Sequence, residues 1–384
     1  MFPRSITAAA VCLLLLTDAP PARGCGFVDS SIGVTLRQDV KASKIVMYVE
    51  AANPRGNPDD GRTDLVILKV LKSDPSIEGK KVVELPRYIT IPDPKKPPRF
   101  LVFADVTKGK PDFYRGIEAS PAIVDYVNGA MAFDVKDHVS LMRYCFGYLD
   151  HPDREIAADA FHEFIRSPDP AIWTAARPLS PEKLRGWLRD ERTRPDRLRL
   201  YAFLLASCGD NTDAALLRER LDNWVRQPQP PMLDGVLTAY TLLDPQEGWA
   251  YTLGLMKDPT MSFVVRYAGL RAARYFRTTA PGILTDEEIL AAVSIALRHR
   301  DMADIPIVYL SEWQCWDLTG QILALVEKEG FDVPIIRRSI LRYALRCPDP
   351  RAAEYVAQLR KTNPRLVEML EEVLRGEAKP PAKP

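Results

Sequence analysis

The chain has 384 residues, with 52 Lys and Arg against 51 Asp and Glu, so its formal net charge is +1. This balance argues against an extended surface for nucleic acid or another polyanion, which needs a basic excess. Hydrophobic residues at 46% and charged residues at 27% also exclude global disorder. The length predicts two or three globular domains of about 150 residues each.

Residues 1–24 have the pattern of a secretory signal peptide. Arg4 precedes an eleven-residue apolar run from Ile6 to Leu16, which is shorter than the about 20 residues of a membrane-spanning helix. Ala22 and Gly24 place small residues shortly before Cys25. We therefore expect cleavage before Cys25 and an exported protein that is periplasmic, attached to a bacterial cell envelope or secreted.

Cys25 leaves a second processing route open. A cysteine at the start of the mature chain is also the attachment point of bacterial lipoproteins, and Gly24 suits that signal. The alternative prediction is therefore a lipid anchor at Cys25. No later segment has the uncharged length that a transmembrane helix needs.

Composition divides the rest of the chain near residue 135. Residues 25–135 contain 22 Val and Ile against 6 Leu, whereas residues 136–384 contain 24 Val and Ile against 32 Leu. β-Branched residues favour strands and leucine favours helices. We predict a β-rich domain over 25–135, a helical domain over 136–375 and a disordered tail, rich in Pro and Lys, over 376–384.

The β-rich part predicts a small antiparallel barrel or sheet with one helix, similar in kind to an OB fold. Short runs of Val, Ile and aromatic residues alternate with turn residues. The helix is expected over 35–42. The strands are expected over 43–52, 63–72, 80–85 and 100–106, with a proline-rich loop over 91–99.

The helical part shows repeated helix-start signals. Ser180-Pro181, Asp258-Pro259 and Asn363-Pro364 each place a capping residue before a proline. Thr285 and Glu288 form a capping box ahead of an apolar run. These signals predict helices of about 10–17 residues joined by short connectors.

A weak internal repeat resembles the HEAT-repeat family. The match is clearest at Val265-Arg266 and Ala268, which follow the Asp258-Pro259 turn. A period of about 40 to 47 residues fits the helical part five or six times. The resemblance implies an α-solenoid, in which stacked repeats share one continuous core, and a role in binding partners.

The first domain more loosely resembles the netrin-like domain shared with tissue inhibitors of metalloproteinases. A cysteine at the mature N-terminus, a short helix and a Val-rich barrel carry this resemblance. Gly26 and Phe27 stand where that family has its Cys-x-Cys start. The resemblance implies the barrel topology, without the family's disulfides or inhibitory mechanism.

Five cysteines remain after the signal, and no two have CxxC spacing. A zinc or redox motif is therefore not indicated. In an exported protein, a disulfide between Cys25 and Cys145 is the first candidate, because it ties the N-terminus to the first solenoid helix. Cys315 and Cys347 are a second possible pair, one repeat apart. Cys208 is expected to be a buried apolar residue.

Other motifs predict no catalytic, cofactor-binding or metal-binding residues. His138, His151, His162 and His299 are too scattered for a ligand set, and phosphate-cradling glycine patterns are missing. An arginine cluster over 185–199 contains Asp190, Glu191 and Asp196. Local pairing of these charges is the expected arrangement, and an anion site is the alternative.

An aromatic stripe is the candidate binding feature for a protein partner. Tyr309, Trp313 and Trp316 fall at i, i+4 and i+7, on one face of a helix. Core packing explains such a stripe, and the alternative is an exposed patch that anchors a protein partner.

These observations lead to three functional hypotheses. The first is an exported, non-enzymatic scaffold that binds a protein partner on the solenoid surface, with no nucleic acid and no cofactor. The second is an enzyme, a hydrolase or lyase that uses acidic residues in the solenoid groove. The third is an inhibitor-like module that acts through Cys25.

Overall fold

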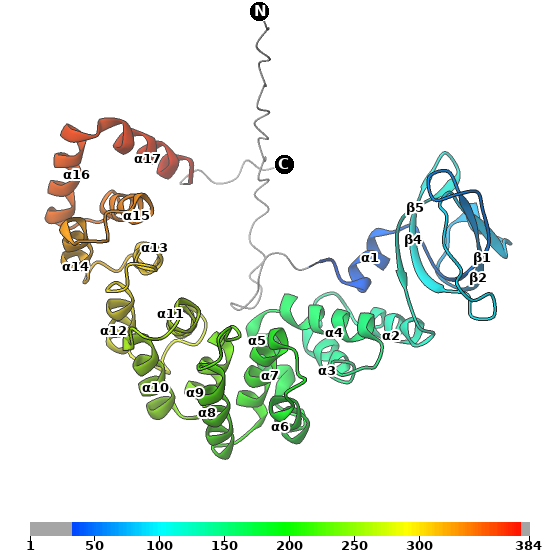
Figure 1. Ribbon diagram of the computed structural model, residues 1–384, viewed down its shortest axis with the longest axis horizontal. Helices are drawn as coiled ribbons and strands as arrows, with labels where there is room; N and C mark the ends of the chain where they lie inside the picture. The colour runs from blue at the N-terminus through cyan, green and yellow to red at the C-terminus, as the bar shows by residue number, and fades with distance from the viewer. Residues whose placement is uncertain (1–32, 378–384) are drawn as a thin grey trace, which may run out of the picture.

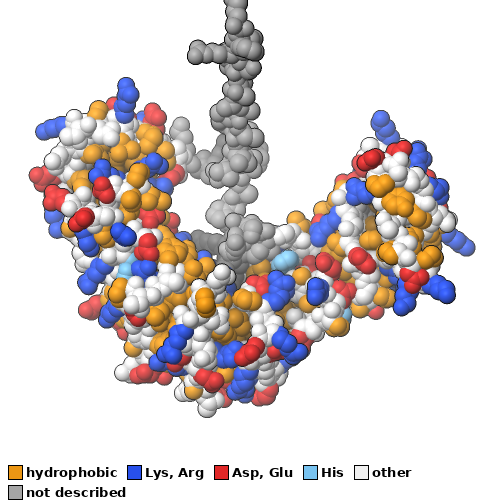
Figure 2. Space-filling model, in the orientation of Figure 1, with side chains coloured by type: hydrophobic (Ala, Val, Ile, Leu, Met, Phe, Trp, Pro, Cys, Tyr) orange, Lys and Arg blue, Asp and Glu red, His pale blue; other side chains and the backbone are white. Residues whose placement is uncertain are grey.

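A computed structural model describes residues 33–377, which form an arc of helices with a curled sheet at one end (Figure 1). The predicted signal peptide, Cys25 and residues 378–384 of the predicted tail lie outside the described residues. Positive and negative side chains are interspersed over the face seen in Figure 2, as the balanced composition predicts.

The N-terminal sheet has five strands, all antiparallel, in the order β3-β2-β1-β4-β5. Register shifts between β1 and β2 and between β4 and β5 bend these strands. The short helix η1 (Pro75–Ile77) lies beside β5. The strands are β1 (Ile45–Arg55), β2 (Arg62–Lys72), β3 (Val82–Leu85), β4 (Arg99–Thr107) and β5 (Lys110–Glu118). The predicted antiparallel β-unit is thus confirmed.

Strand β5 was not among the expected strands. It follows β4 after a two-residue turn in which Lys108 and Gly109 both have positive φ, 51° and 74°. Turns of this kind are usually marked by Asn-Gly or Asp-Gly. Because this turn has Lys108-Gly109 instead of such a pair, the sequence gave little indication of a hairpin here.

The sheet buries both faces, because its strands contribute alternate residues to two cores. Ile45, Met47 and Val49 point into the curled interior of the sheet. Val46 and Tyr48 belong to the core that continues into the helices. Helix α1 (Leu36–Ala42) packs on α2 (Ala122–Met131). It begins at a capping box made by Thr35 and Gln38.

The helices after the sheet form an α-solenoid, as predicted. Packing runs from α3 through α5, α7 and α9 to α11, and α13 packs on α15. In Figure 1, α11, α13 and α15 face the inside of the arc, and α10, α12, α14 and α16 the outside. The helices are α3 (His138–Phe146), α4 (Arg154–Arg166), α5 (Asp169–Ala176), α6 (Pro181–Arg189), α7 (Pro195–Cys208), α8 (Thr212–Trp224), α9 (Asp234–Leu243), α10 (Pro245–Lys257), α11 (Phe263–Thr278), α12 (Asp286–Ala296), α13 (Asp304–Glu312), α14 (Thr319–Ala324), α15 (Pro334–Ala344), α16 (Pro350–Thr362) and α17 (Pro364–Glu377), with the 3₁₀ helix η2 (Leu325–Glu327) after α14.

The helix-start signals are confirmed with one exception. Thr285 and Glu288 form the expected capping box of α12, and Ser180 caps α6. Asp258 does not start a helix, because its carboxylate accepts bonds from the amide and hydroxyl of Thr260 (2.8 and 2.6 Å). This bonding makes a turn, and α11 begins five residues later, after Ser262.

The junction between the two parts has no break in its core. Strand β5 ends at Glu118 and α2 begins at Ala122, while the boundary predicted near residue 135 falls between α2 and α3. Residues of α1, β1, β4 and the first helices share one hydrophobic cluster. Among residues 33–377, no helix combines the length and apolar character required to cross a bilayer.

Candidate functional site

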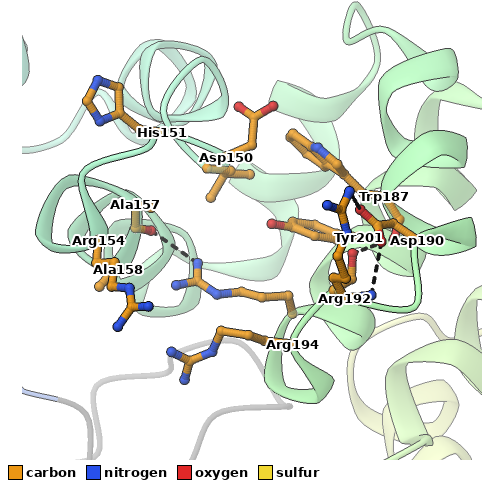
Figure 3. Close-up of a pocket in the computed structure, with 13 residues that line it drawn as sticks. Asp150, His151, Arg154, Ala157, Ala158, Trp187, Asp190, Arg192, Arg194 and Tyr201 are labelled. Atoms are coloured by element: carbon orange, nitrogen blue, oxygen red, sulfur yellow. Dashed lines mark hydrogen bonds and ion pairs between the residues drawn. The ribbon is translucent and has the colours of Figure 1, made fainter.

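A pocket with both aromatic and charged walls lies between α4, α6 and α7 (Figure 3). Its volume is about 800 Å³. We call it the arginine pocket. It is lined by Leu149, Asp150, His151, Arg154, Ala157, Ala158, Trp187, Asp190, Arg192, Thr193, Arg194, Arg197 and Tyr201. The lining therefore contains four arginines and two aspartates, and its net charge is positive.

Arg197 is the buried cation of this pocket. The residue is 7% exposed, and its guanidinium stacks over the ring of Phe161 at 3.8 Å. One nitrogen donates to the carbonyl of Ala157 (3.2 Å). The carboxylate of Asp196 lies 3.8 Å from Nε, which is beyond hydrogen-bond distance. Burial lowers the pKa of Arg197 from its ordinary value.

The neighbouring arginines have close acidic partners, as the sequence predicts. Arg192 binds Asp190 with two side-chain bonds (3.0 and 2.9 Å). Arg194 binds Asp196 in the same way (3.0 and 3.2 Å). Local pairing is therefore confirmed for these two, whereas Arg197 lies farther from its neighbour Asp196 and makes only a longer ion pair with it. Sequence spacing gives no signal for this difference, because Ala157 and Phe161 lie on another helix.

Arg154 adds a second cation from the opposite wall. It is the first residue of α4 and is exposed. Neither a hydrogen bond nor an ion pair joins its side chain to any other residue of the described part of the chain. Figure 3 places it across the pocket from Trp187 and Tyr201. A ligand between these walls would contact a cation on one side and aromatic rings on the other.

Tyr201 and Trp187 form the aromatic wall. Their ring centroids are 4.5 Å apart, and Tyr201 is 5% exposed. Figure 3 shows the Tyr201 hydroxyl pointing toward the middle of the pocket. Burial raises the pKa of Tyr201 to about 12, although the charge of Arg197 opposes the shift. The phenol is therefore protonated at neutral pH and offers a hydrogen-bond donor.

The acidic groups and the histidine of the pocket are already engaged. Asp150 pairs with Lys183 (2.9 Å). Asp190 accepts bonds from Arg192, which lower the pKa of Asp190. Nδ1 of His151 accepts a bond from the amide of Asp153 (3.1 Å) in the turn before α4. Within residues 33–377, no group of three or more His, Cys, Asp and Glu side chains is arranged to hold a metal ion.

The predicted aromatic stripe is divided by the end of a helix. Tyr309 and Trp313 pack together at 5.7 Å, and Arg274 lies over the Tyr309 ring at 4.5 Å. Helix α13 ends at Glu312, so Trp316 leaves the stripe and packs on Tyr343 (5.1 Å). The structure therefore brings Trp313 and Trp316 to a smaller pocket and buries Tyr309.

The predicted disulfides receive no support. Cys145 is a buried free thiol, and its expected partner, Cys25, lies outside the described residues. Cys315 and Cys347 are both free. They lie around the same tyrosine, since Tyr343 donates to the Cys315 carbonyl (3.3 Å) and shares Thr319 with Cys347. Cys208 is half-buried and also free.

Comparisons with known proteins give little beyond the fold. No protein-family model and no curated protein matches this chain. One similar solved structure is human deoxyhypusine hydroxylase in complex with glycerol, at 14% identity and a TM-score of 0.25. The match covers 66% of this chain and 89% of that chain. At this level of similarity, no activity is transferred.

The comparison nevertheless corrects one expectation. We expected a non-enzymatic scaffold because helical repeats most often serve as scaffolds. That expectation is not supported, since the similar helical chain is an enzyme and a fold does not by itself fix function. The netrin-like resemblance of the first domain is not supported by any match.

Proposed function

We propose that the arginine pocket binds a ligand with an anionic group and an attached apolar or aromatic part. The observation that carries this proposal is Arg197, a buried guanidinium without a carboxylate at hydrogen-bond distance. A buried charge is costly unless it is paired. Asp196 lies 3.8 Å from Arg197, so an entering anion would supply a partner at hydrogen-bond distance.

The chemistry of the walls supports this ligand class. Guanidinium groups bind phosphate and carboxylate through paired N–H donors. Arg197 and Arg154 supply such donors, and the Tyr201 hydroxyl adds another. Trp187, Tyr201 and Leu149 supply apolar surface for the rest of the ligand. Inorganic phosphate can use the guanidinium and hydroxyl donors, but it leaves the apolar surface uncovered.

Binding of phenyl phosphate to the full chain tests this proposal by isothermal titration calorimetry, with inorganic phosphate as the smaller probe. We expect phenyl phosphate to bind more tightly than phosphate. Arg197→Met should weaken phenyl phosphate binding by about tenfold or more, because a charge-assisted bond is worth about 1.5–3 kcal/mol.

Arg189→Met is the matched control. Arg189 is an exposed arginine of the same cluster that does not line the pocket. Its loss should leave affinity unchanged. Equal losses in both variants would show nonspecific charge attraction, and no binding of either probe would contradict an anion site.

A second candidate is a hydrolase or lyase that acts on the same ligand. Asp150, His151 and Tyr201 line the same pocket and include the residue types of general acid–base catalysis. Tyr201, being protonated, is the candidate proton donor. Release of phenol from phenyl phosphate would support a hydrolase, provided that Tyr201→Phe abolishes it. If phenyl phosphate remains unchanged after prolonged incubation, the pocket binds this ligand without hydrolysing it.

Export remains a separate proposal. We propose that the signal-like segment 1–24 is removed and that Cys25 begins the mature chain, either free or lipid-modified. The intact mass of the protein from its native host distinguishes these forms. A mass that retains Met1 would contradict export, and with it the inhibitor-like role proposed for Cys25.

A further inference from the structure

A second pocket lies farther along the solenoid, between α11, α12 and the connector from α13 to α14. Its volume is about 320 Å³, at the lower end of the range for small-ligand sites. We call it the tryptophan pocket. It is lined by Arg277, Asp286, Ile289, Leu290, Trp313, Gln314, Cys315, Trp316 and Asp317.

Its connector carries a side chain at a position where the backbone favours glycine. Gln314 has a φ of 53°, and the amide of Cys315 donates to the carbonyl of Leu310 (3.0 Å). Helices that end in this way usually have glycine at the left-handed residue. Glutamine is less favourable there. Its retained amide group lines the pocket and offers both a donor and an acceptor.

The polar groups of the pocket are mixed in sign. Arg277 forms an ion pair with Asp286, so most of this charge is cancelled. Asp317 accepts a bond from the Cys315 thiol (3.2 Å). Together with Gln314, these groups surround the opening with hydrogen-bond donors and acceptors but without a strong net charge.

Part of the lining is apolar and aromatic. Ile289 and Leu290 come from α12, while Trp313 and Trp316 come from the connector side. Trp316 is held by its contact with Tyr343. The indole N–H of Trp313 is buried and has no acceptor among the described residues.

We infer that the tryptophan pocket binds an uncharged sugar of one or two rings. A pyranose ring has an apolar C–H face that packs on tryptophan and a rim of hydroxyls that both donate and accept. An anion would meet Asp286 and Asp317. A cation would be repelled by Arg277, whose guanidinium lies 6.0 Å from the centre of the Trp313 ring.

This site does not depend on the anion site of the arginine pocket, because the two pockets share no lining residue. Saturation-transfer NMR on the full chain tests it. The probes are glucose, galactose, mannose, xylose, N-acetylglucosamine and cellobiose, with acetate and tetramethylammonium as charged comparisons. We expect transfer to at least one sugar and to neither charged probe.

Two variants connect binding to this pocket. Trp316→Ala should abolish transfer to the sugar. Since that change also removes a packing contact, Gln314→Gly is the decisive variant: it suits the left-handed backbone and removes only the amide side chain. It should weaken binding about three- to tenfold, as expected for one hydrogen bond, without lowering the melting temperature.

Lys108→Gly is the matched control. Lys108 is an exposed residue with a similar φ of 51° in the β4–β5 turn, so it tests the same backbone change away from the pocket. Sugar affinity should not change. Absence of transfer to every sugar, stronger binding of a charged probe, or an unaltered affinity in Gln314→Gly would each overturn the inference.

Discussion

Two of the buried charges in the solenoid, Asp234 and Arg197, lie in contrasting surroundings. Asp234, on α9, is fully buried and lies 2.7 Å from Arg271 on α11 and 3.5 Å from Arg199 on α7. Arg197, only two residues before Arg199, is buried to a similar degree but faces a carbonyl and an aromatic ring. Asp234 therefore links α7, α9 and α11, whereas Arg197 borders the arginine pocket.

This difference separates a structural charge from a candidate binding group. Where the chain supplies the counter-ion, the pair is complete and removing one partner leaves the other uncompensated. Where the chain supplies none at hydrogen-bond distance, the charge remains available to a ligand. Asp159 is also buried without a cation at hydrogen-bond distance, and its partners are the Leu36 amide (2.6 Å) and the Tyr126 hydroxyl (2.8 Å).

Asp234→Ala should give the largest loss of stability. It leaves two arginines without their carboxylate, and breaking a buried ion pair costs about 3–5 kcal/mol. Urea unfolding followed by circular dichroism measures the change. Asp332→Ala, in an exposed pair with Arg337, is the control and should cost less than about 1 kcal/mol. Similar losses in both variants would show that the buried carboxylate stabilises the fold no more than an exposed one.

Asp159 should make stability depend on pH. Burial raises its pKa to about 7, with Glu163 adding to the shift and the charge of Arg115 opposing it. The folded protein therefore holds a proton on Asp159 that the unfolded chain has lost above about pH 4. Its contribution to the free energy of unfolding should decline, by on the order of 3 kcal/mol, as pH rises from 4 to 7.

Comparison of the native chain with Asp159→Asn measures this effect. Urea unfolding at pH 5 and pH 8 should show a smaller decline in the variant, which keeps a hydrogen-bonding side chain but does not titrate. If the free energy of unfolding falls equally with pH in the two proteins, Asp159 is not the group responsible for the decline.

Arg197→Met should separate ligand binding from stability. The variant removes a buried charge with no carboxylate partner at hydrogen-bond distance, so its free energy of unfolding should equal or exceed that of the native chain. Saturating phenyl phosphate, at about 100 times its Kd, should stabilise the native chain by about 2.7 kcal/mol and the variant much less. Equal stabilisation of both proteins would place the ligand elsewhere.

Helix caps provide the smallest test. Thr285 accepts a bond from the amide of Glu288 (3.2 Å), so Thr285→Ala should cost about 1 kcal/mol. Ser262 precedes α11 without a side-chain capping bond, and Ser262→Ala should change stability much less. Thermal unfolding compares the two, and a reversed order would show that the distinction between these caps is wrong.

Local sequence signals predicted the elements better than they predicted the sites. The capping box at Thr285 and the Val-rich strands depend on neighbouring residues, so they were visible in the sequence. Strand β5 and the start of α11 were missed because the turns at Lys108 and Asp258 depend on backbone angles and side-chain bonds. The arginine cluster was recognised, but its sequence favoured pairing for every member.

The sequence alone determined the order of the two parts, the absence of a strong net charge and the alternation of helices with short connectors, because these follow from composition and local periodicity. The tertiary structure decided the surroundings of Arg197, since Ala157 and Phe161 of α4 approach it only after the helices stack. It also separated Trp316 from Tyr309, because a helix end redirects the chain regardless of the spacing that the sequence shows.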